Sequence, residues 1–166
     1  MDSIGTVPLR KDHILRSFDC GVPALNEYLQ KYARQNQSKD AGRTFVMSRD
    51  LQVLAYYTLV SSSVEFDLAP APMRKGLARH PLPVALMARL AIDQSLHGQG
   101  WGKALMRDAY RRVIAASEEI GIRAFVVDAK DEEAARFYEH MGLTRFESAS
   151  LRLFCLSSEI RSAVSE

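Results

Sequence analysis

Three glycines at every second position form the strongest chemical signal in this 166-residue sequence. Gly98, Gly100 and Gly102 lie between an apolar segment and a long amphipathic segment that follows them. Glycine lets the main chain approach a ligand closely, and consecutive N–H groups at the start of a helix can converge on phosphate oxygens. We therefore predict a phosphate-binding loop, with a plain tight turn as the alternative interpretation.

The spacing of these glycines argues against two common nucleotide sites. A Walker A loop needs Gly-x-x-x-x-Gly-Lys-Ser/Thr, which is not present, and Gly-x-Gly-x-x-Gly fails because Lys103 occupies its sixth position. Nucleotide hydrolysis and dinucleotide binding are thus disfavoured.

Residues 97–102 resemble the pyrophosphate loop of the GNAT superfamily of N-acetyltransferases, whose pattern is Gln/Arg-x-x-Gly-x-Gly/Ala. His97 stands where the family has Gln or Arg, and an imidazole still donates one hydrogen bond. The resemblance implies that acetyl-CoA is the co-substrate, that no metal takes part, and that a splayed strand binds the pantetheine arm through its main chain. The residues that it assigns to acetyl-CoA are Leu90, Ala91, Ile92, His97, Gly98, Gln99, Gly100, Trp101, Gly102 and Lys103.

A second motif places a tyrosine on a helix near the C-terminus. Residues 134–143 match the family signature Ala-x-x-Phe-Tyr-x-x-x-Gly-Phe, with Leu143 as the conservative departure. Acetyl transfer needs a proton for the departing thiolate, and a phenol of ordinary pKa about 10 holds its proton at neutral pH. We expect Tyr138 to be the general acid, and the alternative is a half-buried helix aromatic.

No carboxylate stands out as a general base. Asp93, Asp128 and Glu132 lie near strand ends, where solvated turn or capping roles are the simpler interpretation. An α-amino group has an ordinary pKa of about 7.7 to 8.0, and an adjacent ester should lower that pKa further. Such an acceptor amine needs little help with deprotonation.

Much of the chain, roughly residues 13–156, also resembles the acetyltransferase toxins of bacterial toxin–antitoxin pairs. This resemblance implies acetylation of the free amino group of aminoacyl-tRNA, which blocks translation. It also implies a ribbon-helix-helix antitoxin, operator DNA reached only through the antitoxin complex, and leaves a homodimer open. Asp128 stands where these toxins commonly have histidine. The segments that carry the resemblance are residues 18–21, 33–37, 43–46, 55–57 and 86–93.

An RNA acceptor requires basic groups that contact phosphates. A formal net charge of +2 neither establishes nor excludes such a partner. Three candidates lie inside the toxin-like segments and two in the proline-rich excursion, and each has a solvated surface charge as its alternative interpretation. These candidates are Arg34, Arg43, Arg89, Arg74 and Lys75.

Two rival functions remain open. One is a GNAT enzyme that acts on a small amine or a protein N-terminus, which an acceptor screen would distinguish. The other is a catalytically silent acetyl-CoA-binding or partner-binding module, against which the retained Tyr138 argues.

The expected elements form one α/β (α+β) domain over residues 1–166. The resemblance implies a mixed, mostly antiparallel sheet of six to seven strands flanked by about four helices. Residues 65–83 carry four prolines and read as an irregular excursion. The periodicity predicts helices over residues 25–37, 100–121 and 131–141, and strands over residues 44–47, 53–60, 84–92, 124–127, 144–146 and 151–156.

Composition adds a few limits. Cys20 and Cys155 lie far apart and have no metal-ligand spacing, so neither a disulfide framework nor a zinc site is expected. The first residues lack the pattern of a secretory leader, and the apolar runs are too short for a membrane span. We expect a cytoplasmic location and a frayed tail over residues 161–166.

Overall fold

The structure is a computed structural model, and it describes residues 5–164. Seven strands follow the order β1-β2-β3-β4-β5-β7-β6. The strands are β1 Val7–Pro8, β2 Arg43–Arg49, β3 Gln52–Val64, β4 Leu82–Ile92, β5 Ala124–Asp128, β6 Thr144–Arg145 and β7 Arg152–Leu156. The helices are α1 Pro23–Glu27, α2 Ala33–Ser38, α3 Ala71–Arg74, α4 Trp101–Ser117, α5 Glu132–His140 and α6 Ser157–Val164, with a π-helical segment η1 Tyr28–Tyr32 and 3₁₀ turns η2 Phe66–Leu68 and η3 Gln94–Leu96.

The chain divides into two compact units. Within the described residues, unit 1 comprises residues 5–60 and 88–109, and unit 2 comprises residues 61–87 and 110–164. β3, β4 and α4 each pass from one unit into the other.

A hairpin forms the strand framework of unit 1. β2 and β3 pair antiparallel from Arg43 opposite Leu59 to Arg49 opposite Gln52, and β1 pairs with β2 on the other side. The two residues of the turn, Asp50 and Leu51, both have positive φ, the conformation that matches the twist of a tight hairpin. The predicted strands over residues 44–47 and 53–60 are confirmed, and β3 runs further than expected, to Val64.

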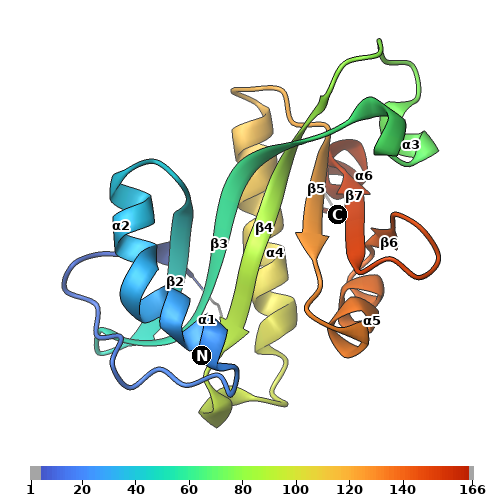
Figure 1. Cartoon of the computed structure of the whole chain (residues 1–166). Coiled ribbons are helices and arrows are strands. Elements are labelled where there is room, and N and C mark those ends of the chain that lie inside the picture. Colours follow the sequence, from blue (N-terminus) through green and yellow to red (C-terminus); the bar gives the residue numbers. More distant parts are fainter. Residues whose placement is uncertain (1–4, 165–166) are drawn as a thin grey trace. The chain divides into compact units, whose positions relative to one another are not determined.

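The first helical region packs against this hairpin, on the side where Figure 1 shows α1 and α2. Pro23 stands at its first helical position, where the missing N–H costs nothing. Tyr28, Leu29 and Ala33 bury their apolar faces in one cluster with residues of β2, β3 and β4. The predicted helix is confirmed, but its middle turn is π-helical, with the Ala33 N–H bonded to the Tyr28 carbonyl.

The opposite face of the hairpin is tied to α4 inside unit 1. Tyr57 is fully buried, and its hydroxyl donates to Oδ2 of Asp108 at 2.5 Å. The Thr6 hydroxyl donates to the same carboxylate oxygen. Helix α4 therefore holds both a central strand and the start of the described chain.

Unit 2 contains a parallel step followed by antiparallel strands. Residues 84–87 of β4 pair parallel with residues 124–127 of β5, β5 pairs antiparallel with β7, and β7 with β6. Arg123 ties the excursion after β3 to the start of β5, because its guanidinium donates to the carbonyls of Met73 at 2.7 Å and Pro72 at 3.2 Å. A mixed, mostly antiparallel seven-stranded arrangement is confirmed.

The frayed tail is the prediction that the structure contradicts. Helix α6 begins directly after β7 and continues to Val164, and Ile160 is only 1% exposed. The Ser157 hydroxyl donates to the Ile122 carbonyl at 2.6 Å, which fixes the start of the helix. Burial of one apolar side chain and this hydrogen bond order residues 161–164, whereas residues 165–166 lie outside the described part of the chain.

Candidate functional site

The glycine loop follows β4 through a short braced turn. Asp93 caps η3, because its Oδ1 accepts from the Ser95 N–H at 3.0 Å and the Ser95 hydroxyl at 2.8 Å. Its Oδ2 accepts the Asp19 N–H at 3.0 Å, and the Gln94 N–H donates back to the Asp19 carbonyl at 2.9 Å. Burial raises the pKa of Asp93, but these hydrogen bonds outweigh burial and lower it overall. The carboxylate therefore stays ionised and holds the turn.

The backbone of the loop suits a phosphate ligand. Gly98 and Gly100 have φ values of +76° and +82°, which L side chains rarely adopt, so glycine is required for conformation. In the first turn of α4 the Ala104 N–H donates to the Gly100 carbonyl at 3.5 Å. The N–H groups of residues 101–103 therefore precede the helical ladder and point outward from its positive end. Main-chain donors at a helix start fit the pyrophosphate of acetyl-CoA.

The side chains of His97 and Trp101 in this loop have different hydrogen-bonding environments. His97 Nε2 lies 2.7 Å from the Ile92 carbonyl, so the imidazole ties the loop back to the end of β4. Trp101 Nε1 is buried and finds no acceptor within the described residues. This orphaned donor beside the glycines agrees with a polar ligand at this place.

The end of β4 extends beyond its parallel partner. Its pairing with β5 covers residues 84–87, and the strand continues to Ile92. The Asp93 N–H bonds to the Leu54 carbonyl at 2.8 Å, and Ala91 is buried in the unit 1 core. Leu90, Ala91 and Ile92 therefore keep main-chain groups outside the parallel ladder, as binding to a pantetheine amide requires.

Tyr138 is positioned by a helix that is fixed at both ends. The Asp131 carboxylate caps α5 by accepting the Ala134 N–H at 2.8 Å. The Arg145 guanidinium bonds to Glu132 at 2.5 and 3.0 Å and to Glu139 at 3.0 Å. These contacts join the first and last turns of α5 to β6.

The Tyr138 hydroxyl has the environment of a weak acid. Its side chain packs edge-on against Phe137, with ring centroids 5.3 Å apart, and the residue is 8% exposed. Burial raises the pKa of the Tyr138 phenol above its ordinary value. No hydrogen-bond partner for this hydroxyl occurs among residues 5–164. The group is therefore protonated at neutral pH and able to donate its proton.

The carboxylates considered as bases are already engaged. Arg152 donates to both oxygens of Asp128, at 2.7 and 2.9 Å. The hydrogen bond from Arg145 lowers the pKa of Glu132. With Asp93 held in its cap, none of these groups is poised to take a proton.

The predicted tRNA contacts of unit 1 have defined partners. Arg34 donates to the carbonyls of Arg10 and His13, and Arg43 bonds to Asp40 at 2.7 Å. The Arg89 guanidinium lies 3.6 Å from the centroid of the Tyr28 ring and takes part in no described ion pair. Arg34 and Arg43 thus have structural roles, and their contact with tRNA stays a prediction.

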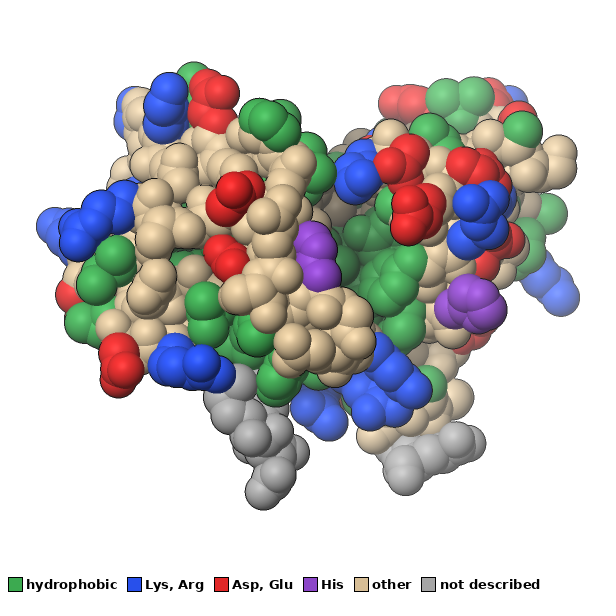
Figure 2. All heavy atoms as spheres, turned by 90° about the horizontal axis from the view of Figure 1, so that it is seen from below, with side chains coloured by type: hydrophobic (Ala, Val, Ile, Leu, Met, Phe, Trp, Pro, Cys, Tyr) green, Lys and Arg blue, Asp and Glu red, His purple; other side chains and the backbone are tan. Residues whose placement is uncertain are grey.

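The predicted contacts of unit 2 lie on the excursion between β3 and β4. Arg74 and Arg79 both place their guanidinium carbons 5.6 Å from the Phe66 ring centroid. Lys75 is exposed at the end of α3. Figure 2 shows Lys and Arg side chains at several separate places, interspersed with Asp and Glu. Charge alone therefore does not mark one nucleic-acid surface on this face.

Two further observations concern metal binding and membrane spans. Within residues 5–164, no group of three or more His, Cys, Asp or Glu side chains is arranged to hold a metal ion. None of the helices in the same part of the chain combines the length and apolar character that a membrane span requires.

Comparison with known proteins begins with the sequence. A family model described as an acetyltransferase (GNAT) domain matches residues 40–144. A protein of Mycobacterium tuberculosis named tRNA-acetylating toxin is 37% identical over 150 residues, which cover 90% of this chain and 90% of that protein.

Solved structures agree with this similarity. AtaT complexed with acetyl-methionyl-tRNAfMet has a TM-score of 0.87 and 33% identity, and the match covers 98% of this chain and 99% of that one. A variant AtaT bound to acetyl-CoA and the C-terminus of the antitoxin AtaR has a TM-score of 0.84 and 32% identity, over 99% and 100% of the chains. An AtaT–AtaR complex bound to DNA has a TM-score of 0.77 and 32% identity, over 97% and 99%.

Proposed function

The chain belongs to the GNAT family of acetyltransferases, and from this premise we propose that it transfers acetyl from acetyl-CoA to the free amino group of aminoacyl-tRNA. The observation that carries the proposal is 37% identity to a tRNA-acetylating toxin over 90% of both chains. An acetylated α-amino group can no longer act as a nucleophile in peptide-bond formation. The product of the reaction is therefore useless for elongation, and translation stops.

Unit 1 carries the groups that bind the donor substrate. Acetyl-CoA supplies an acetyl thioester, which is activated toward attack by an amine. The N–H groups at the start of α4, together with Gly98 and Gly100, bind its pyrophosphate. Main-chain groups of Leu90, Ala91 and Ile92 pair with the pantetheine arm, and His97 holds the loop to β4 through the Ile92 carbonyl.

Tyr138 supplies the proton that the reaction needs. The neutral amine attacks the thioester carbonyl carbon, the carbon–sulfur bond breaks, and the departing sulfur takes the proton of the Tyr138 hydroxyl. The Tyr138 phenolate then regains a proton from water, which returns the group to its starting state. An α-amino group beside an ester has a low enough pKa to be largely neutral, so it attacks without the help of a general base. Water accepts the proton that the amine loses after the attack. A phenol whose pKa is raised by burial serves as an acid and not as a base at neutral pH.

The same premise extends to partners. AtaT has been solved with the C-terminus of its antitoxin AtaR, and AtaT–AtaR has been solved on DNA. We propose a cognate antitoxin for this chain, with operator DNA bound only through the toxin–antitoxin complex. Charged tRNA is a cytoplasmic substrate, so the cytoplasm is the proposed location.

Transfer of labelled acetyl from acetyl-CoA to a pool of charged tRNA tests the proposal. We expect wild type to label charged but not uncharged tRNA, and Tyr138→Phe to lower kcat by about 100-fold or more, the usual contribution of a general acid. Tyr32→Phe is the matched control, because Tyr32 is 48% exposed and its hydroxyl donates to Glu27 at 3.4 Å. Acetyl-CoA binding by each variant, measured by calorimetry, checks folding.

Two results would direct the assignment elsewhere. A folded protein that binds acetyl-CoA but leaves charged tRNA unlabelled would favour an enzyme for small amines or protein N-termini. Full activity of Tyr138→Phe would show that Tyr138 is not the general acid, and it would leave the assignment of charged tRNA as the acceptor unchanged.

A further inference from the structure

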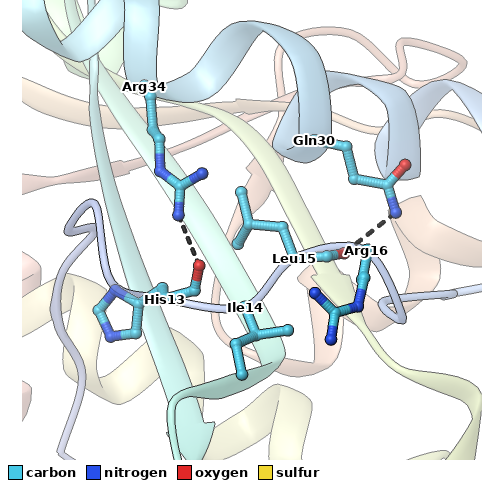
Figure 3. A pocket seen from close by; sticks show the side chains of 6 residues that line it. All are labelled: His13, Ile14, Leu15, Arg16, Gln30 and Arg34. Atoms are coloured by element: carbon cyan, nitrogen blue, oxygen red, sulfur yellow. Dashed lines mark hydrogen bonds between the residues drawn. The ribbon is translucent and has the colours of Figure 1, made fainter.

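A cavity of about 440 Å³ lies in unit 1, between the segment before α1 and the helical region that follows it. Figure 3 shows Arg34 and Gln30 extending from the helix toward the segment that carries Arg16. Its lining residues are His13, Ile14, Leu15, Arg16, Gln30 and Arg34.

Hydrogen bonds from the helix fix the wall of this cavity. The Gln30 side-chain amide donates to the carbonyls of Leu15 at 3.1 Å and Phe18 at 3.2 Å. Nη2 of Arg34 donates to the carbonyls of His13 at 2.6 Å and Arg10 at 3.1 Å. These hydrogen bonds satisfy the carbonyl acceptors and hold the segment against the helix.

Two guanidinium groups that line the cavity take part in no ion pair within residues 5–164. Nη1 of Arg34 has no acceptor among residues 5–164, and Arg16 is exposed and takes part in no ion pair in the same part of the chain. Arg43 and Arg152, in contrast, each bond to a carboxylate. No carboxylate lines the cavity.

His13 adds no charge of its own. The Arg10 N–H donates to its Nδ1 at 2.9 Å, so the neutral ring carries its proton on Nε2. Burial, and after it the nearby Arg10, lower the pKa of His13. The two guanidinium groups are therefore the charged groups of this lining.

We propose that this cavity binds a backbone phosphate of the RNA acceptor, an inference that rests on the proposed function. Guanidinium groups present paired donors that match phosphate oxygens, and both Arg16 and Arg34 line the cavity. Arg34 is the fixed donor of the site, and Arg16 is the adjustable one.

The site is connected to the acetyl-CoA loop through the chain. The segment that carries Arg16 continues to Asp19, which exchanges hydrogen bonds with Asp93 and Gln94 at the start of that loop. Both sites thus belong to unit 1 and share one braced segment.

Salt dependence of tRNA binding tests the proposal. We would measure the affinity of the full-length protein for labelled charged tRNA over a salt series. Arg16→Gln should weaken binding about five- to tenfold near physiological salt and reduce the slope of log K against log salt by about one. Arg16→Lys, which keeps the charge, should restore the slope. Arg49→Gln is the matched control, because Arg49 is exposed in the same unit and takes part in no described ion pair.

The outcomes separate this inference from the proposed function. An unchanged slope in Arg16→Gln, with labelled acetyl still reaching charged tRNA, would overturn the site alone. If the salt slope of tRNA binding depends on Arg16 but no acetyl reaches charged tRNA, the phosphate site stands and the proposed acetyl transfer is wrong. Inorganic phosphate could raise the Tm of wild type but not of Arg16→Gln, while both proteins bind tRNA equally. In that case the cavity binds free phosphate and the RNA assignment is wrong.

Discussion

His97 shows that the side chain and the main chain of one loop can have separate roles. The sequence shows a departure from the family pattern, and the structure gives the imidazole a partner on β4, the Ile92 carbonyl at 2.7 Å. A loop that binds phosphate through main-chain N–H groups tolerates such an exchange, because the side chain braces the loop and the backbone supplies the donors. The positive φ values of Gly98 and Gly100 are therefore the stricter requirement.

Gly100→Ala tests that requirement. A Cβ at Gly100 meets nothing within 4 Å, so the cost comes from its φ of +82° alone. We expect a loss of about 1 kcal/mol in the free energy of unfolding and at least about fivefold weaker acetyl-CoA binding. Gly76→Ala is the control, since Gly76 has a φ of +77° and equally open space but lies on the excursion after β3. Denaturant titration and calorimetry measure both, and equal loss of acetyl-CoA binding in the two variants would contradict the prediction.

The basic side chains show the limit of sequence reasoning at this scale. The sequence predicts tRNA contacts for Arg34 and Arg89 because both lie in segments that resemble the toxins. The sequence could not show that Arg34 holds the carbonyls of Arg10 and His13, because these contacts depend on how the preceding segment folds back over the helix. For the same reason Arg16 and Gln30 drew no attention, although they line a cavity with Arg34.

At the scale of elements, periodicity predicted the helices and strands that have many apolar residues in register. The strands over residues 44–47 and 53–60 and the end of β4 at Ile92 agree with prediction, because runs of apolar residues determine them. The π-helical turn of η1 could not be predicted, since it depends on how Tyr28 packs against Tyr56 and Arg89. Helix α6 was missed because Ile160, the one apolar side chain buried on the described helix, gives no periodic signal.

Tyr57→Phe tests how β3 is joined to α4. The variant loses a hydrogen bond to the Asp108 carboxylate from a fully buried phenol, so we expect the free energy of unfolding to fall by about 1.5 to 3 kcal/mol. The neighbouring Tyr56→Phe is the control. Tyr56 is equally buried but donates to the neutral Leu25 carbonyl at 2.7 Å, and its loss should be about 0.5 to 1.5 kcal/mol. A larger loss from Tyr56→Phe in urea titrations would refute this ranking.

At the scale of the whole molecule, a single domain over residues 1–166 stays a prediction. The division into two units has boundaries at residues 60–61, 87–88 and 109–110, and these fall inside β3, β4 and α4. Elements that are continuous across a boundary cannot melt on one side without fraying on the other. We therefore expect one cooperative unfolding transition.

Two optical probes check this expectation. Trp101 is the single tryptophan and lies in unit 1, so its fluorescence follows that unit, whereas far-UV circular dichroism follows both. The two urea curves should coincide with one midpoint. Separate midpoints would show that the units unfold independently and that the single-domain prediction is wrong.

The three shared elements also constrain the gene. A reading frame that stopped at residue 60 or 87 would end inside a strand, and one that stopped at residue 109 would end inside a helix. Such fragments would leave strand edges and apolar faces uncovered, which quality-control proteases recognise. A chain cut at any of these three boundaries would therefore leave no fragment that has all of its own strands and helices intact.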